Sequence, residues 1–68
     1  MNVERLTYMA NQIGKFFAHK PEEEAVAGIE DHLRKFWDPR MRAAILAGDG
    51  EGLDPLARAA VERLRRGS

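Results

Sequence analysis

The chain contains no cysteine among its 68 residues. This absence excludes disulfides, thiolate metal ligands and cysteine nucleophiles, and it favours a reducing compartment. The sequence also lacks any apolar run approaching the ~20 residues that a membrane-spanning helix needs. Residues 1–5 are polar and do not resemble a signal peptide. We therefore expect a cytoplasmic protein.

An excess of charge of either sign is missing as well. Eleven basic and eleven acidic side chains cancel, so the chain lacks the strong positive field that drives binding to a phosphate backbone. At this length we expect a single domain spanning residues 1–68, near the size where folding buries only ~60% of the unfolded chain's surface. Small scaffolds of this kind usually need a staple or a binding partner.

Apolar residues recur at alternating steps of three and four, the period of one helical face. This pattern predicts helices over about 3–17, 22–37 and 39–47, and a last helix that starts at Pro55 and ends in an arginine-rich turn. No strand-like alternation occurs. The link between the first two helices is short, so they should pair antiparallel. The fold class expected is all-α, a small compact bundle of three to four helices.

Two Asp-Pro dipeptides are typical of helix starts. Pro39 disfavours helical dihedrals at Asp38, so one helix should stop there, and the Asp38 carboxylate can cap the next helix, whose first position suits Pro39. Asp54 and Pro55 repeat the arrangement. Asn2 is the predicted cap of the first helix.

Residues for enzyme chemistry are few. His19 and His32 come from a link and from mid-helix, and no third His or Cys completes a catalytic zinc set. The carboxylates of residues 22–24 diverge by about 100° from one to the next and cannot converge on one substrate. A solvated, dipole-stabilised first turn accounts for them better. We predict no catalytic residues and no metal site.

Two aromatic pairs carry more information. Adjacent helical residues diverge by about 100°, so Phe16-Phe17 and Phe36-Trp37 cannot send both members into so small a core. We assign Phe17 and Phe36 to the core and expect Phe16 and Trp37 to be exposed or half-exposed. The alternative is that these two cap the ends of the bundle.

Basic side chains surround Trp37 in the sequence. A tryptophan among arginines is typical of interface hot spots, and we predict a partner-binding surface made of Phe16, Arg34, Trp37, Arg40 and Arg42. Two other interpretations stay open. The charges could form a solvated face, or, with Lys35, they could contact phosphates in a small nucleic-acid-binding regulator.

Several glycines need explanation. Gly14 and Gly28 fall inside predicted helices, where each costs ~1 kcal/mol relative to alanine, so close approach of a helix or a partner should compensate. Residues 48–52 are glycine-rich but carry Asp49 and Glu51, which would repel phosphate. A helix end and connector is the favoured interpretation of that stretch.

Longer motifs carry a resemblance to a known family. Met9-Ala10-Asn11-Gln12-Ile13 and Phe36-Trp37-Asp38-Pro39-Arg40-Met41-Arg42 are runs with no general structural reason to occur together. In these motifs the sequence resembles the delta subunit of NAD-dependent, molybdenum-containing formate dehydrogenases. The stretches that carry the resemblance, the two motifs included, are residues 8–17, 24–25, 32–42 and 52–56. The match spans nearly the whole chain and is weakest in the glycine-rich connector and after Leu64.

The resemblance implies a small cytoplasmic accessory subunit of a bacterial enzyme. Its partners would be the larger formate dehydrogenase subunits, chiefly the catalytic molybdenum subunit, and these would carry molybdopterin, iron-sulfur clusters, FMN and NAD. This chain would hold none of these groups, in keeping with its lack of cysteine and of a dinucleotide fingerprint. The implied contribution is assembly, stabilisation or cofactor loading of the catalytic complex.

Overall fold

The structure is a computed structural model that describes residues 2–67, and four helices account for most of them. They are α1 (Val3–Phe17), α2 (Glu22–Phe36), α3 (Pro39–Ala47) and α4 (Pro55–Gly67). The chain is 79% helical, and the described residues include no strand. The all-α fold class is confirmed, and the observed helix bounds agree closely with those that the apolar periodicity predicts.

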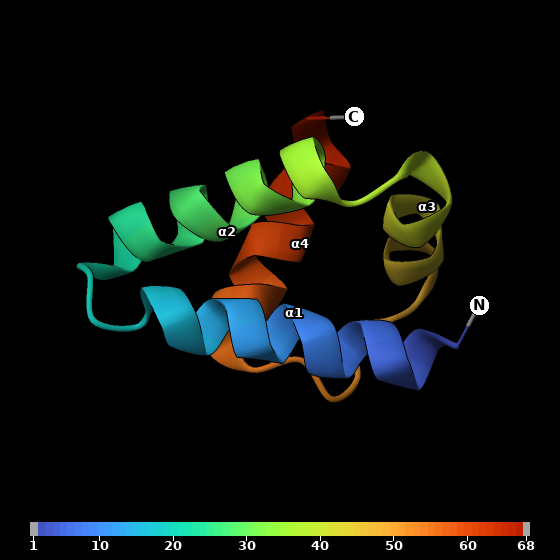
Figure 1. Cartoon of the computed structure of the whole chain (residues 1–68), viewed down its shortest axis with the longest axis horizontal. Coiled ribbons are helices and arrows are strands. Elements are labelled where there is room, and N and C mark those ends of the chain that lie inside the picture. Colours follow the sequence, from blue (N-terminus) through green and yellow to red (C-terminus); the bar gives the residue numbers. More distant parts are fainter. Residues whose placement is uncertain (1, 68) are drawn as a thin grey trace.

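The helices are arranged around one antiparallel pair. In Figure 1, α1 and α2 run in opposite directions and are joined by the short turn that the sequence predicts. Helix α4 runs behind this pair, where it packs chiefly on α2, and α3 lies across the end of the pair next to the start of α1. One side of the α1–α2 pair is therefore covered by α4, and the opposite side is not.

The predicted caps are present where the structure defines them. The Asn2 side chain accepts a hydrogen bond from the amide of Arg5, and the Asp38 carboxylate accepts one from the amide of Met41 at 2.9 Å. Pro39 occupies the first turn of α3. Helix α4 begins at Pro55, directly after Asp54. Capping by the Asp54 carboxylate itself stays a prediction.

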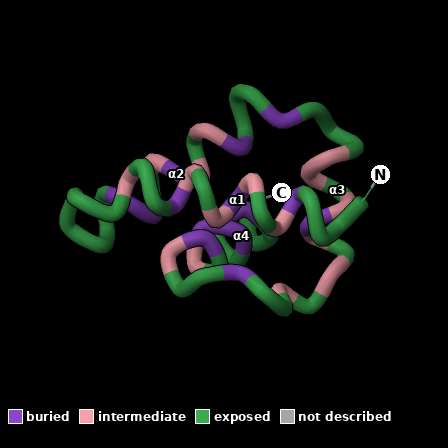
Figure 2. The backbone as a smooth tube through the Cα atoms, turned by 60° about the horizontal axis from the view of Figure 1, so that its bottom comes forward, coloured by how far each residue is buried: buried purple, intermediate pink, exposed green. Residues whose placement is uncertain are grey.

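The core lies where α1, α2 and α4 meet, and α3 and the loop before α4 each add a residue. Buried positions recur along the inward sides of the helices (Figure 2). Leu6 and Ala10 come from α1, and a larger set comes from the other elements: Val26, Ile29, Leu33, Trp37, Ile45, Leu53, Ala57, Ala60, Val61 and Leu64. Small residues on α1 and α4 allow these helices to approach closely.

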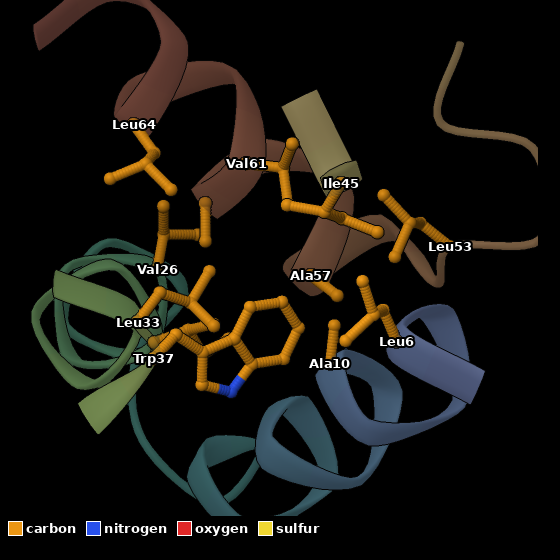
Figure 3. Close-up of a cluster of buried hydrophobic side chains, with 12 residues drawn as sticks. Leu6, Ala10, Val26, Leu33, Trp37, Ile45, Leu53, Ala57, Val61 and Leu64 are labelled. Carbon is orange, nitrogen blue, oxygen red and sulfur yellow. The ribbon is translucent and has the colours of Figure 1, made fainter. Parts of the chain in front are cut away.

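The assignment of Phe36 to the core and Trp37 to the surface is wrong. Trp37 is only 4% exposed and Phe36 is 72% exposed. Figure 3 shows the Trp37 indole in the cluster between Leu33, Ala10 and Ala57. Phe36 instead stacks on His32, with 4.8 Å between ring centroids.

The physical reason is that the helix ends one residue earlier than the sequence argument assumed. Helix α2 stops at Phe36, and Trp37 has extended dihedrals (φ −85°, ψ 135°). Its side chain therefore no longer follows the 100° step of the helix, and the bend of the chain towards α3 turns the indole inward. Phe36 keeps the helical phase but lies where no other helix covers it.

Packing accounts for one of the two helical glycines. A methyl group at Gly28 would lie 2.6 Å from the Phe17 ring, so glycine leaves the space that this ring occupies between α1 and α2. Gly14 is buried, but a methyl group there would lie 3.8 Å from Ala57 and from Ile29, which is ordinary van der Waals contact. Close helix packing therefore explains Gly28, and the packing around Gly14 would accept alanine.

Candidate interaction surface

Arg42, predicted to bind a partner, instead caps the end of α2. Its Nη1 donates to the carbonyl oxygens of Leu33 at 3.4 Å, Arg34 at 3.2 Å and, at shorter range, Trp37. The last carbonyls of a helix carry partial negative charge, and most of them have no partner within the helix. The Leu33 carbonyl also accepts from the Trp37 amide at 3.2 Å, so the guanidinium chiefly serves the carbonyls of Arg34 and Trp37 and ties α3 to the end of α2.

Of the other basic residues near Trp37, two form ion pairs with carboxylates of this chain and one does not. Arg34 lies 3.0 Å from Glu30, which also pairs with Arg63 of α4 at 3.0 Å, so this carboxylate ties α2 to α4. Lys35 pairs with Asp31 at 3.0 Å. Arg40 is exposed, and no partner for its side chain exists among residues 2–67. The predicted basic ring around an exposed tryptophan is therefore not formed.

Asn11 has a structural role that the sequence did not reveal. Its Nδ2 donates to the Gly52 carbonyl at 2.9 Å, and its Oδ1 accepts from the Asp54 amide at 2.8 Å. The two bonds fasten the loop before α4 to the outside of α1. Gly50 and Gly52 have positive φ values of 82° and 86° in this loop, a conformation that favours glycine. The only sequence signal for the contact was the presence of Asn11 and Gly52 in the resembling motifs.

We expect Asn11→Ala to destabilise the protein by about 1–3 kcal/mol, because it removes two hydrogen bonds at once. Urea unfolding followed by circular dichroism measures the change. Gln12→Ala is the matched control, since Gln12 is exposed on the same helix. Equal unfolding midpoints for the two variants would contradict the role assigned to Asn11.

A second arginine, Arg65, hydrogen-bonds to carbonyls at the end of α3, as Arg42 does at the end of α2. Its Nη2 donates to the carbonyls of Leu46 at 2.9 Å and Gly48 at 3.3 Å. Arg58 donates to the Gly50 carbonyl at 2.9 Å. Three arginines of this chain, Arg42, Arg58 and Arg65, therefore donate hydrogen bonds to backbone carbonyls within the domain. These guanidinium groups are less available to bind a partner.

A groove of about 580 Å³ lies between the outside of α1 and the glycine-rich loop. Its wall includes the exposed Tyr8, and its lining carries the carboxylates of Glu4, Asp49 and Glu51 but no basic residue. Negative lining of this kind repels phosphate. The groove thus agrees with the sequence argument against a phosphate cradle at residues 48–52.

The two histidines lie in separate places. His19 Nδ1 lies 3.1 Å from the Phe16 carbonyl oxygen, at the end of α1, whereas His32 stacks on Phe36. Over the described part of the chain, no three side chains of the metal-binding types come together. Nor is any helix within residues 2–67 long and apolar enough to cross a membrane.

Two exposed phenylalanines are the most conspicuous surface feature. Phe16 is 73% exposed, as the sequence predicts, and Phe36 is 72% exposed, contrary to prediction. Phe16 makes an edge-to-face contact with Phe17, with 5.4 Å between ring centroids. Exposed aromatic rings on a small helical domain are typical of protein–protein contact surfaces.

The fold and surface together define a class of protein: a small helical domain whose notable exposed groups suit contact with another protein. Within this class, the chain matches the family model of the NADH-dependent formate dehydrogenase delta subunit FdsD over residues 5–61. The chain belongs to this family, as the resemblance predicted. No curated protein and no solved structure matches it.

Proposed function

We propose that the chain is a non-catalytic accessory subunit of a cytoplasmic NAD-dependent formate dehydrogenase. The observation that carries the proposal is the family match over residues 5–61. A delta subunit belongs to an oxidoreductase with larger subunits, and the proposed partner among them is the catalytic molybdenum subunit. That complex, and not this chain, would hold molybdopterin, iron-sulfur clusters, FMN and NAD.

The proposed contribution is to assembly, to stability or to loading of the molybdenum cofactor. The exposed Phe16 and Phe36 offer a means of binding another protein.

Three of the five partner contacts predicted from the sequence are no longer proposed. Trp37 is buried in the core, Arg34 forms an ion pair with Glu30, and Arg42 hydrogen-bonds to backbone carbonyls of α2. Phe16 and Arg40 are exposed, and both stay as proposed partner contacts. The alternative of a nucleic-acid-binding regulator loses most of the free cations on which it depended.

Affinity purification of the tagged chain from its host tests the proposal. We expect a large molybdenum-containing formate dehydrogenase to copurify with it, identified by mass spectrometry and by formate-dependent NAD reduction in the eluate. Reproducible absence of such an enzyme would overturn the proposal. Salt-sensitive retention of DNA or RNA in its place would favour the regulator.

A further inference from the structure

Helix α3 is the shortest of the four helices. It has nine residues, whereas α1 and α2 have 15 each and α4 has 13. Helices shorter than about 12–15 residues are only marginally stable in water on their own. The helical form of α3 therefore depends on its contacts with the rest of the domain.

The apolar attachment of α3 is small. Ile45 is the one buried residue among its nine, whereas α2 and α4 each bury four. Met41, Ala44 and Leu46 are half-buried and pack against the core cluster. The largest contact between helices joins α2 and α4, and α3 takes no part in it. An element with few buried apolar contacts is expected to open at a low cost in free energy.

Arginine side chains make the other attachments of α3. Arg65 of α4 donates to the carbonyls of Leu46 and Gly48, and both bonds are exposed to solvent. At the opposite end, Arg42 donates to carbonyls at the end of α2, and its bond to the Trp37 carbonyl is part-buried. Water competes for exposed hydrogen bonds, so their net contribution is modest. These bonds position α3 without adding much buried contact.

Helix α3 lies apart from the contact between α2 and α4. Figure 1 shows it across the end of the α1–α2 pair, next to the start of α1. Val3 and Thr7 of α1 line one groove together with Ile45, and a methyl group at Gly48 would lie 4.0 Å from the Val3 side chain. Glycine-rich residues 48–52 follow α3, and such a segment can change its path with little strain.

We propose that α3 is a strap, a segment held at both ends that opens as one unit while α1, α2 and α4 stay packed. Opening breaks the bonds of Arg42 and Arg65, and it uncovers Ile45 together with the stretch 3–7 of α1 beside it. The open form presents apolar surface that the closed form covers. This conformational device is independent of the proposed function, because it follows from the packing of this chain alone.

Hydrogen exchange of the full-length chain, followed by NMR at increasing urea, tests the proposal without any substitution. We expect the amides of α3 to share one free energy of opening and to exchange at least about tenfold faster, relative to their intrinsic rates, than the slowest amides of α2 and α4. Their exchange should also depend less on urea, because opening of one short helix exposes little surface.

Two results of this measurement would overturn the proposal. In the first, α3 shares the free energy of opening and the urea dependence of α2 and α4, so it opens only when the whole domain unfolds. In the second, the amides of α3 exchange independently of one another, as at a fraying helix end, and α3 is not a unit.

Val26→Ala distinguishes separate opening from unfolding of the whole domain. Val26 is 5% exposed, lies in the half of α2 away from α3 (Figure 1), and lines a hollow with Ala59 of α4. Its truncation should accelerate exchange of the slowest α2 and α4 amides by about tenfold, since buried methyl groups are lost. The α3 amides should stay within about twofold of their wild-type rates, because opening of α3 leaves the contacts of Val26 in place. Equal acceleration in α2, α3 and α4 would contradict separate opening.

Single cysteines test whether opening uncovers Ile45. The chain has no cysteine of its own, so Ile45→Cys places one thiol on α3 and Val61→Cys places a matched control on α4. The wild-type side chains are 2% and 1% exposed. We expect a soluble thiol reagent to label the Ile45→Cys variant at least about tenfold faster at urea concentrations below the unfolding transition. Equal labelling of the two folded variants would show that Ile45 is uncovered only by whole-domain unfolding, and the proposal would be overturned.

Discussion

Replacing Trp37 with alanine should unfold a large fraction of the protein at 37 °C. The side chain is 4% exposed and belongs to the core cluster that joins α1, α2 and α4. Truncation of a buried aromatic residue costs about 3–5 kcal/mol. Domains of this size have little stability to lose, since total values of about 5–15 kcal/mol are typical and small cores lie at the low end.

Chemical denaturation followed by circular dichroism measures this loss. Phe36→Ala is the matched control, because the neighbouring ring is 72% exposed and its removal should change stability by no more than about 0.5 kcal/mol. Trp37 is the only tryptophan of the chain, so its fluorescence reports its own burial. An indole as open to iodide quenching as free tryptophan, or equal midpoints for the two variants, would contradict the position assigned to Trp37.

Replacing Arg42 with alanine should give the second large effect. The guanidinium serves the carbonyls of Leu33, Arg34 and Trp37, all at the end of α2. Hydrogen bonds from a charged donor contribute about 1.5–3 kcal/mol. After the substitution the Leu33 carbonyl would keep its bond from the Trp37 amide, whereas the part-buried bond to the Trp37 carbonyl would be lost. We therefore expect a destabilisation of about 2 kcal/mol, together with a loosened corner between α2 and α3.

Arg40→Ala provides the comparison for this measurement. Arg40 lies two residues earlier on the same helix, is exposed and has no partner within residues 2–67. Its removal should leave the urea midpoint nearly unchanged. The cap assigned to Arg42 would be refuted by midpoints that fall equally in both variants.

The helices and their ends could be predicted because the signals for them are local. The Asp38-Pro39 dipeptide ends one helix and starts the next, and the Asp38 cap forms as predicted. Apolar spacing placed Leu6, Ile29 and Leu33 on inward faces, and all three are buried. Each of these features depends on residues within about two helical turns.

The surface around the corner could not be predicted in the same way. The 100° step between neighbouring helical residues does not hold for Trp37, because this residue lies just beyond the end of α2. For that reason Trp37 is buried and Phe36 is exposed, the reverse of the prediction. The contacts of Arg42 and Asn11 link groups that are distant in the chain or lie on different elements. Long side chains reach many acceptors, so their partners follow from the packed fold rather than from spacing.

The corner therefore has a different role from the one its composition suggested. Trp37 lies in the core, and Arg42 of α3 holds carbonyls at the end of α2. The exposed rings are those of Phe16 and Phe36. In the run over residues 36–42, the burial of Trp37 and the hydrogen bonds of Asp38 and Arg42 are explained by the fold of this chain.

The central claim, an accessory role in a formate dehydrogenase, is tested most directly by deleting the chain from its host. The larger subunits are then purified, and their molybdenum content, subunit composition and formate-dependent NAD reduction are compared with those of the intact strain. The account predicts that at least one of these falls and that the wild-type chain restores it. An enzyme fully assembled, fully loaded and fully active without the chain would contradict the account.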